Sequence, residues 1–297
     1  MNWQTLILLH AFVAAFQILQ SRAIARIPKA RHAALSVNAV AFTALFVIGI
    51  MITLFYGPAS IQEVKNYWPF LTLCGICFTA GSVFMYKALV YMESAVVSVI
   101  TTVTALFTLI LAGVILNERL SLMQILGAMI LIPTIWYILL LASNEKQGIK
   151  IHNRAWLRGL GFALTASAAF AAGSVLEKYS INHVSISTYI IGSWGTQVIM
   201  AWVFVLLLNK KSLRILNDPK IMMMSVRLGV IRSFAAALFL LAIIRSNNVT
   251  LMIIISNFRI IVVALLAGFF LGERQHYTQK LAAAAAAFLA LGIIFWK

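Results

Sequence analysis

The sequence has few charged residues and very few acidic ones. Of its 297 residues, 10% are charged, and Asp and Glu together number 7. Soluble globular domains carry about a quarter of their residues as charges, so this composition excludes a soluble enzyme or soluble regulatory domain. We also find no cluster of Asp, Glu or His that would indicate catalysis in a membrane, and we expect no enzymatic activity.

Cysteine is also scarce, and the common cofactor motifs are missing. The 2 cysteines, Cys74 and Cys77, are spaced i, i+3 in an apolar stretch, with no second Cys or His pair to complete a zinc site. We interpret them as small buried hydrophobic residues. No phosphate loop, dinucleotide-binding fingerprint, nucleophile elbow or His-Glu-x-x-His motif occurs, so we expect neither a metal nor a cofactor.

Apolar residues are in large excess. They make up 63% of the chain, and the mean hydropathy is +0.99. A helix needs about 20 apolar residues to cross about 30 Å of hydrocarbon, and ten such stretches fit without overlap. We therefore predict an all-α integral membrane protein with ten transmembrane helices. The predicted spans are Trp3–Ser21, Ala33–Tyr56, Tyr67–Tyr91, Ala95–Asn117, Leu122–Ala142, Arg158–Lys178, Ile186–Leu208, Ile221–Arg245, Thr250–Gly272 and Thr278–Trp296.

An internal repeat divides the chain. The segment LAGVILNER at Leu111–Arg119 returns as LAGFFLGER at Leu266–Arg274, 155 residues later, which indicates duplication. Five spans per half is an odd number, so the second half enters from the opposite side of the bilayer. We predict two inverted five-helix repeats, residues 1–142 and 158–297, joined by a loop at 143–157. Such repeats surround a midplane cavity in secondary transporters; the alternative is a duplicated structural bundle.

The formal net charge of +16 reports topology rather than nucleic-acid binding. The basic residues flank the predicted spans, and most of them fall on one side, including Arg22, Arg26, Lys210 and Arg214. Cytoplasmic loops are enriched in Lys and Arg. The charge distribution therefore predicts that this side is cytoplasmic and that both termini lie outside.

Two short motifs at helix ends resemble a known family. They are Asn117-Glu118-Arg119 and Gly272-Glu273-Arg274, followed by Gln124 and Gln279 respectively, and they resemble the EamA-like ten-helix members of the drug/metabolite transporter superfamily. The resemblance covers essentially the whole chain. We interpret Glu118, Arg119, Glu273 and Arg274 as structural anchors at helix ends.

The resemblance implies a multi-pass secondary transporter of a small organic metabolite in the inner or plasma membrane. The family often carries a proline about thirteen residues before the motif Glu, where this chain has Ala105 and Ile260. Its helix bending is therefore not carried over. Its members usually have cytoplasmic termini, opposite to what the charge distribution predicts.

Two cations lie deep in predicted spans, Arg232 in the eighth and Arg259 in the ninth. An arginine at a helix centre costs about 2.5 to 3.5 kcal/mol on insertion scales, so such residues normally face the bundle interior or an aqueous cavity. With Ser256 and Asn257, Arg259 is suited to hold a carboxylate or phosphate of the substrate. The alternative is internal pairing with carbonyl groups.

Polar residues at helical spacing mark further faces. Ordinary interhelical hydrogen bonding is the alternative for each, but together they favour a shared cavity of helices one, three, four, six, eight and nine. His10, which can titrate near neutrality, is either a proton-coupling group or a hydrogen-bonded structural histidine. The candidate residues are His10, Gln17, Ser82, Tyr86, Thr101 and Thr104.

The sequence predicts no membrane-buried carboxylate, and so favours exchange or facilitated movement over carboxylate-based proton coupling. The acids Glu63, Glu93, Glu145, Glu177 and Asp218 all map to loops or helix ends. Two other functions stay open: a flippase for an anionic lipid headgroup and a membrane-embedded lipid enzyme. A GxxxG spacing at Gly268 and Gly272 is compatible with either an intramolecular helix contact or a homodimer.

Overall fold

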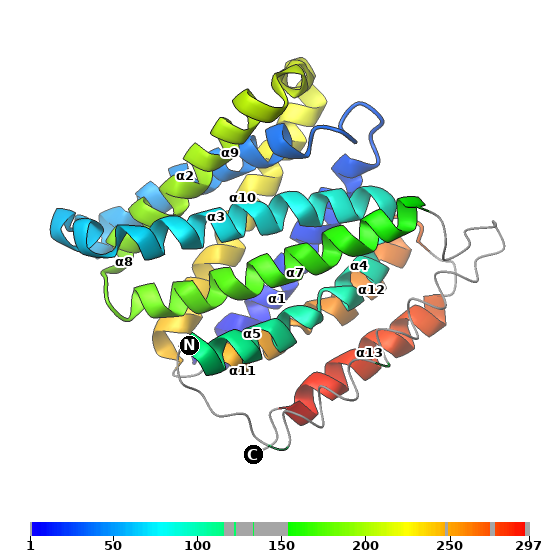
Figure 1. The fold of residues 1–297 in the computed structure, drawn as a ribbon. Helices are drawn as coiled ribbons and strands as arrows, with labels where there is room; N and C mark the ends of the chain where they lie inside the picture. The colour runs from blue at the N-terminus through cyan, green and yellow to red at the C-terminus, as the bar shows by residue number, and fades with distance from the viewer. Residues whose placement is uncertain are drawn as a thin grey trace.

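The computed structural model describes residues 2–115, 154–246, 249–273 and 277–294, together with the single positions 122 and 133. Every element in these residues is helical (Figure 1). Seven spans are long and apolar enough to cross a membrane, counting α4 with α5, and α8 with α9, as one span each. The described part of the chain therefore has the form of an all-helical, multi-pass membrane protein.

The first half contains four of the predicted spans. α3 begins six residues earlier than predicted because Ser60 caps it, accepting a hydrogen bond from the Glu63 amide. The fifth predicted span, Leu122–Ala142, lies outside the described residues apart from the two single positions. The bounds are α1 Trp3–Ala25, α2 Ala34–Tyr56, α3 Ile61–Tyr91, α4 Ser94–Ile100 and α5 Val103–Ile115.

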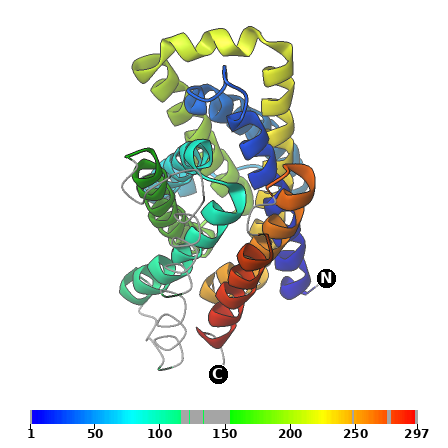
Figure 2. The ribbon, with the colours of Figure 1, turned by 90° about the vertical axis from the view of Figure 1, so that its right-hand side faces the viewer.

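The second half contains five predicted spans, two of which consist of more than one helical segment. A π-helical segment, η1, interrupts the seventh predicted span, and a 3-10 helix, η2, lies across the ends of α9 and α10 (Figure 2). Asp218 caps α10, accepting from the Lys220 amide at 3.1 Å. The bounds are α7 Arg154–Ile181, α8 Ile186–Tyr189, η1 Ile190–Trp194, α9 Gly195–Leu208, η2 Lys210–Asn217, α10 Pro219–Arg245, α11 Val249–Ser256, α12 Arg259–Phe270 and α13 Tyr277–Ile294.

The fourth and ninth predicted spans both break in the middle, α4 from α5 and α11 from α12. At each break, backbone amides bond three residues back instead of four. One of these bonds falls at the same repeat register in both spans: Ala105 to Thr102 at 2.9 Å and Ile260 to Asn257 at 2.9 Å. The chain therefore interrupts both helices at one register without the family's proline.

Helices 155 residues apart run in opposite directions. We call the side of the molecule where α1 ends the basic side. α7 begins there, since a Cβ on Gly159 would contact Met92 and Tyr91 at the end of α3. α10 also begins there, because the Gln20 side chain donates to the Met224 carbonyl, whereas α3 ends there. α12 ends and α4 begins on the basic side, where Ser94 donates to Glu273.

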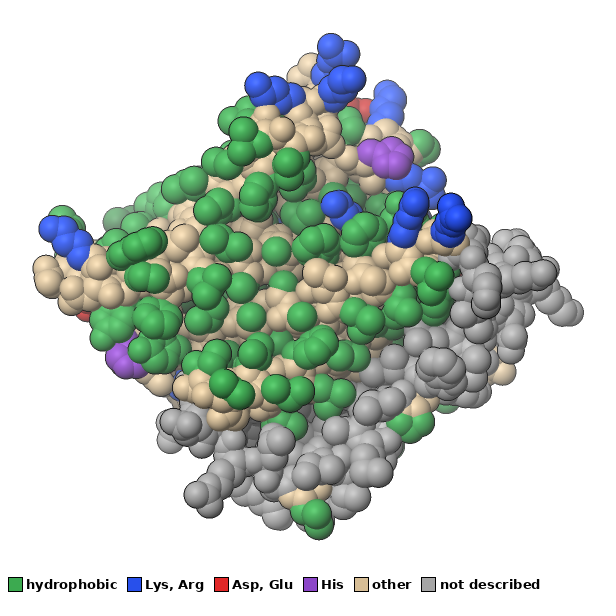
Figure 3. Space-filling view, viewed as in Figure 1, with side chains coloured by type: hydrophobic (Ala, Val, Ile, Leu, Met, Phe, Trp, Pro, Cys, Tyr) green, Lys and Arg blue, Asp and Glu red, His purple; other side chains and the backbone are tan. Residues whose placement is uncertain are grey.

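Helix packing has the same symmetry. α3 packs along α7, and their counterparts 155 residues away, α10 and α1, pack along each other. Small residues allow close helix contacts elsewhere too: a Cβ on Gly229 of α10 would lie 2.5 Å from the Ala41 carbonyl oxygen of α2. Outward faces are apolar, and Lys and Arg gather at the helix ends (Figure 3). This distribution suits a bundle surrounded by lipid.

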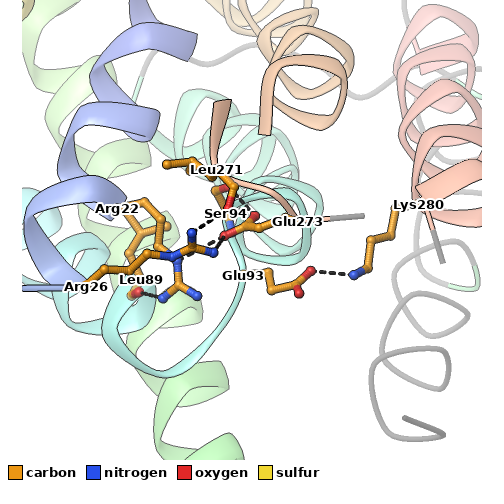
Figure 4. A network of polar contacts seen from close by, with 8 residues as sticks. All are labelled: Arg22, Arg26, Leu89, Glu93, Ser94, Leu271, Glu273 and Lys280. Carbon is orange, nitrogen blue, oxygen red and sulfur yellow. Dashed lines mark hydrogen bonds and ion pairs between the residues drawn. The ribbon is translucent and has the colours of Figure 1, made fainter. Parts of the chain in front are cut away.

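The predicted anchor at Glu273 is the centre of a buried ionic network on the basic side (Figure 4). Its carboxylate accepts from Arg22 Nε at 3.1 Å, from Arg26 Nη2 at 2.8 Å, and from both the amide and the hydroxyl of Ser94. Gly272, with φ +67, makes the turn that places it. We call Arg22, Arg26, Ser94 and Glu273 the latch. The other three anchor residues, Glu118, Arg119 and Arg274, lie outside the described residues.

A second ion pair reinforces this end of the molecule. Lys280 of α13 donates to Glu93, the residue that precedes α4. Gly268 of α12 contacts the Tyr277 ring of α13, and the Tyr277 hydroxyl donates to the Leu265 carbonyl at 3.2 Å. The GxxxG spacing thus serves an intramolecular contact at Gly268, and the homodimer stays a prediction.

Candidate functional site

A cavity of about 160 Å³ lies in the middle of the bundle. All six predicted helices contribute to its wall, and α2 and the η1 region contribute as well. Most of the predicted site residues line it. They are His10, Gln17, Ser82, Thr104, Arg232, Ser256 and Arg259, with Thr101 lining a smaller adjoining pocket that also includes Ser21 and Met85.

Arg232 lies halfway along α10 and is 7% exposed. Its Nη2 donates to Asn38 Oδ1 at 3.0 Å, and its guanidinium carbon lies 4.5 Å from the centre of the Phe42 ring. The Asn38 Nδ2 donates to the Ala34 carbonyl at 2.8 Å, which fixes the orientation of that amide. Nε and Nη1 of Arg232 have no partner among the described residues. Nη2 of the guanidinium is therefore held by Asn38, and Nε and Nη1 are left to donate to a ligand.

Arg259 is the first residue of α12 and therefore follows the helix break directly. Its Nε is buried without a partner in the described part of the chain, as is Nδ2 of Asn257. Buried donors normally have acceptors. Of these two donors, only Nε of Arg259 belongs to a residue that lines the cavity.

His10 is a hydrogen-bonded histidine. Its Nδ1 lies 2.8 Å from the Ala235 carbonyl oxygen, and its ring lies 5.1 Å from the Phe239 ring. A carbonyl can only accept, so Nδ1 carries a proton and donates to Ala235. This geometry favours the structural interpretation of His10 while leaving Nε2 available at the cavity.

Glu177 corrects the prediction that no carboxylate is buried in the membrane. It is 5% exposed and lines the cavity beside the Tyr189 hydroxyl. The predicted sixth span ended at Lys178, which put Glu177 at a helix end. α7 continues to Ile181, so Glu177 lies a full turn inside the helix. The repeat register, which pairs Glu177 with Arg22, was the only signal that marked it in the sequence.

Two predicted site residues lie elsewhere. Tyr86 points away from the cavity, and its hydroxyl donates to the Ala30 carbonyl at 3.0 Å. Asn257 is buried behind the wall rather than in it.

Sequence reasoning also missed the aromatic part of the wall. Apolar side chains in apolar helices carry no periodic signal that separates cavity walls from lipid-facing surfaces. These residues are Phe42, Phe78, Phe170, Tyr189, Trp194 and Phe239.

The two cysteines, predicted to be small buried hydrophobic residues, differ in burial, because Cys77 is only partly buried. Cys74 is buried, with its sulfur 3.5 Å from the Gly173 carbonyl oxygen and 3.6 Å from the Tyr189 hydroxyl. Within the described ranges, no three His, Cys, Asp or Glu residues are grouped closely enough to hold a metal ion.

Comparison with known proteins identifies the first half of the chain. The EamA-like transporter family matches residues 1–140. A solved crystal structure resembles the fold with a TM-score of 0.67 and 15% sequence identity, covering 99% of this chain and 95% of that chain. Identity at this level shows a shared fold alone. No curated protein sequence matches the chain.

Proposed function

We propose that this chain, which matches the EamA-like transporter family over residues 1–140, is a secondary transporter of a small organic metabolite. It works by alternating access in the inner or plasma membrane. The observation that carries the proposal is the central cavity, where buried nitrogens of Arg232 and Arg259 have no hydrogen-bond partner among the described residues. An empty apolar cavity would suit a structural bundle, whereas buried free donors suit a site that binds and releases a solute.

The proposal includes ten spans in two inverted repeats. Its support is the opposite direction of helices 155 residues apart and the matching breaks between α4 and α5 and between α11 and α12. Two repeats around one cavity offer two alternative packings of similar energy, and exchange between such packings opens a central site to one side at a time.

The substrate carries a carboxylate or a phosphate that binds Arg259 and Arg232. Burying guanidinium nitrogens without acceptors is costly, and a substrate anion offsets that cost with charge-assisted hydrogen bonds. Nε and Nη1 of Arg232 have no partner among the described residues, so each can donate a hydrogen bond to an oxygen of a carboxylate or phosphate.

Ligand-induced stabilisation tests this proposal. Purified protein would be screened by thermal unfolding against carboxylates and phosphate esters, because a ligand that binds the native state raises the unfolding temperature. For the best ligand, we expect Arg259→Gln and Arg232→Gln each to lower affinity about ten- to hundredfold, the range for hydrogen bonds to charged groups. Arg259→Lys should rescue only partly, because an ammonium lacks the planar fork.

Arg214→Gln is the matched control, since Arg214 is exposed on η2 and should not affect binding. Unchanged affinity in both cavity variants, in protein shown to be folded, would make the arginines structural. A preferred ligand with a positive charge and no negative charge would also reject the anion site.

A flippase for an anionic lipid headgroup is the second candidate, because the same arginines suit a lipid phosphate. It requires a path for acyl chains between the cavity and the bilayer. Fluorescent lipid scrambling or translocation in reconstituted vesicles separates it from transport of a water-soluble metabolite. A membrane-embedded lipid enzyme is disfavoured, because the family is one of transporters.

The position of Glu177 bears on energy coupling. The case for exchange or facilitated movement assumed that no carboxylate was buried in the membrane, and that assumption does not hold. Transport would be measured in vesicles with and without a pH gradient, for the wild type, His10→Gln and Glu177→Gln. This comparison decides between proton-coupled transport and exchange or facilitated movement. If one variant alone loses uphill transport but keeps downhill transport, the residue substituted in it is the proton-coupling group.

A further inference from the structure

We infer that the cavity has a second subsite, at Glu177, which takes a cationic group, so that the substrate carries a positive and a negative charge together. This inference rests on the proposed function and adds the charge pattern of the substrate. It starts from an arrangement that is unusual in a buried site. One cavity holds a carboxylate and two guanidiniums, and they are not paired with one another.

The separation of these charges is the first observation. Throughout the described part of the chain, the ion pairs within 4.0 Å involve other acids, and Glu177 takes part in none of them. The neighbouring Lys178 turns away and donates to the Ile243 and Ser246 carbonyls. Arg232 is held instead by Asn38 and Phe42.

The structure therefore keeps the opposite charges apart. Removing ions from water costs several kcal/mol for each ion, and close pairing is the usual compensation in a protein interior. Asn38 and the Phe42 ring stabilise Arg232 at its own wall, whereas Glu177 projects from α7 on another wall, beside Tyr189. A ligand with both charges compensates all three groups in a single binding event.

A large part of the remaining wall is aromatic. Phe42, Phe78, Phe170, Trp194 and Phe239 line the cavity together with the charged residues. The faces of these rings attract cations and pack against aliphatic carbon. The cavity therefore fits a dipolar molecule with an apolar body, and it disfavours a polyanion such as a nucleotide or a sugar phosphate.

Charge-matched probes test the subsite. One set is leucine, 4-methylpentanoate and 3-methylbutylamine; the other is 5-aminopentanoate, pentanoate and pentylamine. Within each set, the first compound carries both charges, the second only the negative charge and the third only the positive charge. The two sets differ in the distance between the charges. Affinities would be measured by thermal unfolding of the full-length protein in nanodiscs over a range of probe concentrations.

In the wild type we expect the zwitterion of at least one set to bind more tightly than both of its singly charged analogues. Glu177→Gln should weaken that zwitterion about ten- to hundredfold, to the affinity of the carboxylate alone, and should leave the carboxylate unchanged. Glu177→Asp keeps the charge and should retain the preference. Glu63→Gln makes the same substitution at an acid outside the cavity and should change nothing.

The subsite is overturned if the carboxylate binds as tightly as the zwitterion, or if Glu177→Gln leaves their ratio unchanged. Arg259→Gln separates this failure from a failure of the proposed function. If Arg259→Gln weakens both the carboxylate and the zwitterion while Glu177→Gln weakens neither, the anion site stands and the cation subsite is wrong. If no probe of either set stabilises the wild type, both are wrong for compounds of this size.

Discussion

At the scale of single residues, the charged side chains of the cavity depend on neighbours that do not face the substrate. Asn38 is 1% exposed, and both ends of its amide are used, one by Arg232 and the other by the Ala34 carbonyl. Leucine has a similar volume but offers no acceptor. Asn38 is thus a positioning residue for Arg232.

We expect Asn38→Leu to lower the free energy of unfolding by about 1 to 3 kcal/mol, because it leaves the Nη2 of Arg232 without a buried acceptor. Anion affinity should fall with it, since the guanidinium is then free to rotate. Thermal or denaturant unfolding measures the first effect and ligand titration the second. Asn66→Leu, at an exposed position of α3, is the control. Wild-type stability in Asn38→Leu would show that Arg232 is held by other contacts.

The sequence predicted the cavity-lining position of a side chain better when that type of side chain is rare in apolar spans than when it is common there. A charge within an apolar span is conspicuous, so Arg232 and Arg259 were found directly. Glu177 was missed because an apolar window ends wherever a charge appears, and the helix itself continues for another turn. Tyr86 was placed by helical spacing alone, which cannot distinguish a side chain facing a cavity from one that donates to a carbonyl of the α1–α2 loop.

At the scale of helices, close packing depends on glycines at defined contacts. A Cβ on Gly229 of α10 would lie 2.5 Å from the Ala41 carbonyl oxygen and 2.6 Å from the Ala44 Cβ, and neither group is flexible. Gly161 of α7 has nothing within 4 Å of that position. The two glycines therefore form a matched pair, one at a helix contact and one at an open surface.

We expect Gly229→Ala to destabilise the protein by about 1 to 3 kcal/mol through overpacking between α10 and α2. Gly161→Ala should be neutral or should stabilise by up to about 1 kcal/mol, because alanine is the better helix former. Thermal unfolding of both variants in the same detergent provides the comparison. Equal effects would mean that α2 and α10 are not in close contact in solution.

The latch is the other feature that belongs to this scale. It joins the end of α1 to the start of α4 and to the turn after α12. The pocket next to it includes Ser21, the residue before Arg22. We therefore expect the latch to close the cavity on the basic side.

Glu273→Gln should lower the free energy of unfolding by about 3 to 5 kcal/mol, the range for removing one partner of a buried ion pair. It should also expose Ser21 to water. In a background without Cys74 and Cys77, a cysteine at position 21 should react faster with a membrane-impermeant thiol reagent applied from the basic side. Asp218→Asn, a cap on the same side, should not change the rate, and an unchanged rate in Glu273→Gln would mean that the latch is not the closure.

The helix positions themselves were largely predictable. A span of about 20 apolar residues leaves little choice of location in so apolar a chain, and the described helices agree with the predicted spans to within a few residues at most ends. The breaks at Thr102 and Asn257 were not predictable, because neither proline nor glycine marks them. The π-helical η1 segment was equally hidden, since its hydrogen-bond shift depends on packing against α2 and α3.

At the scale of the whole molecule, the distribution of charge sets the expected orientation. The basic side carries Arg22, Arg26, Lys29 and Arg31 on the α1–α2 segment and Lys210, Lys211 and Arg214 on η2. The opposite side has Lys65, Lys178 and Arg245 in the described residues. Because Lys and Arg accumulate in cytoplasmic loops, we expect the basic side to be cytoplasmic.

C-terminal fusions test this orientation. A reporter active only outside the cytoplasm should be active at the C-terminus, and a reporter active only in the cytoplasm should be silent, because α1 begins and α13 ends on the side opposite to the basic one. An added Lys-rich insertion beside Lys65 should weaken the preference. A strong cytoplasmic signal from the unmodified chain would reverse the assignment and give the arrangement usual among family members.

The latch gives the basic side of the cavity an electrostatic barrier of its own. In the repeat register, Arg22 and Arg26 correspond to Glu177 and Ile181, and Ser94 corresponds to Val249, so these three latch residues are not repeated in the second half. Opening the basic side separates buried ions, which costs free energy. In the proposed transport cycle we therefore expect the empty cavity to wait with the basic side shut, until a bound substrate offsets that cost.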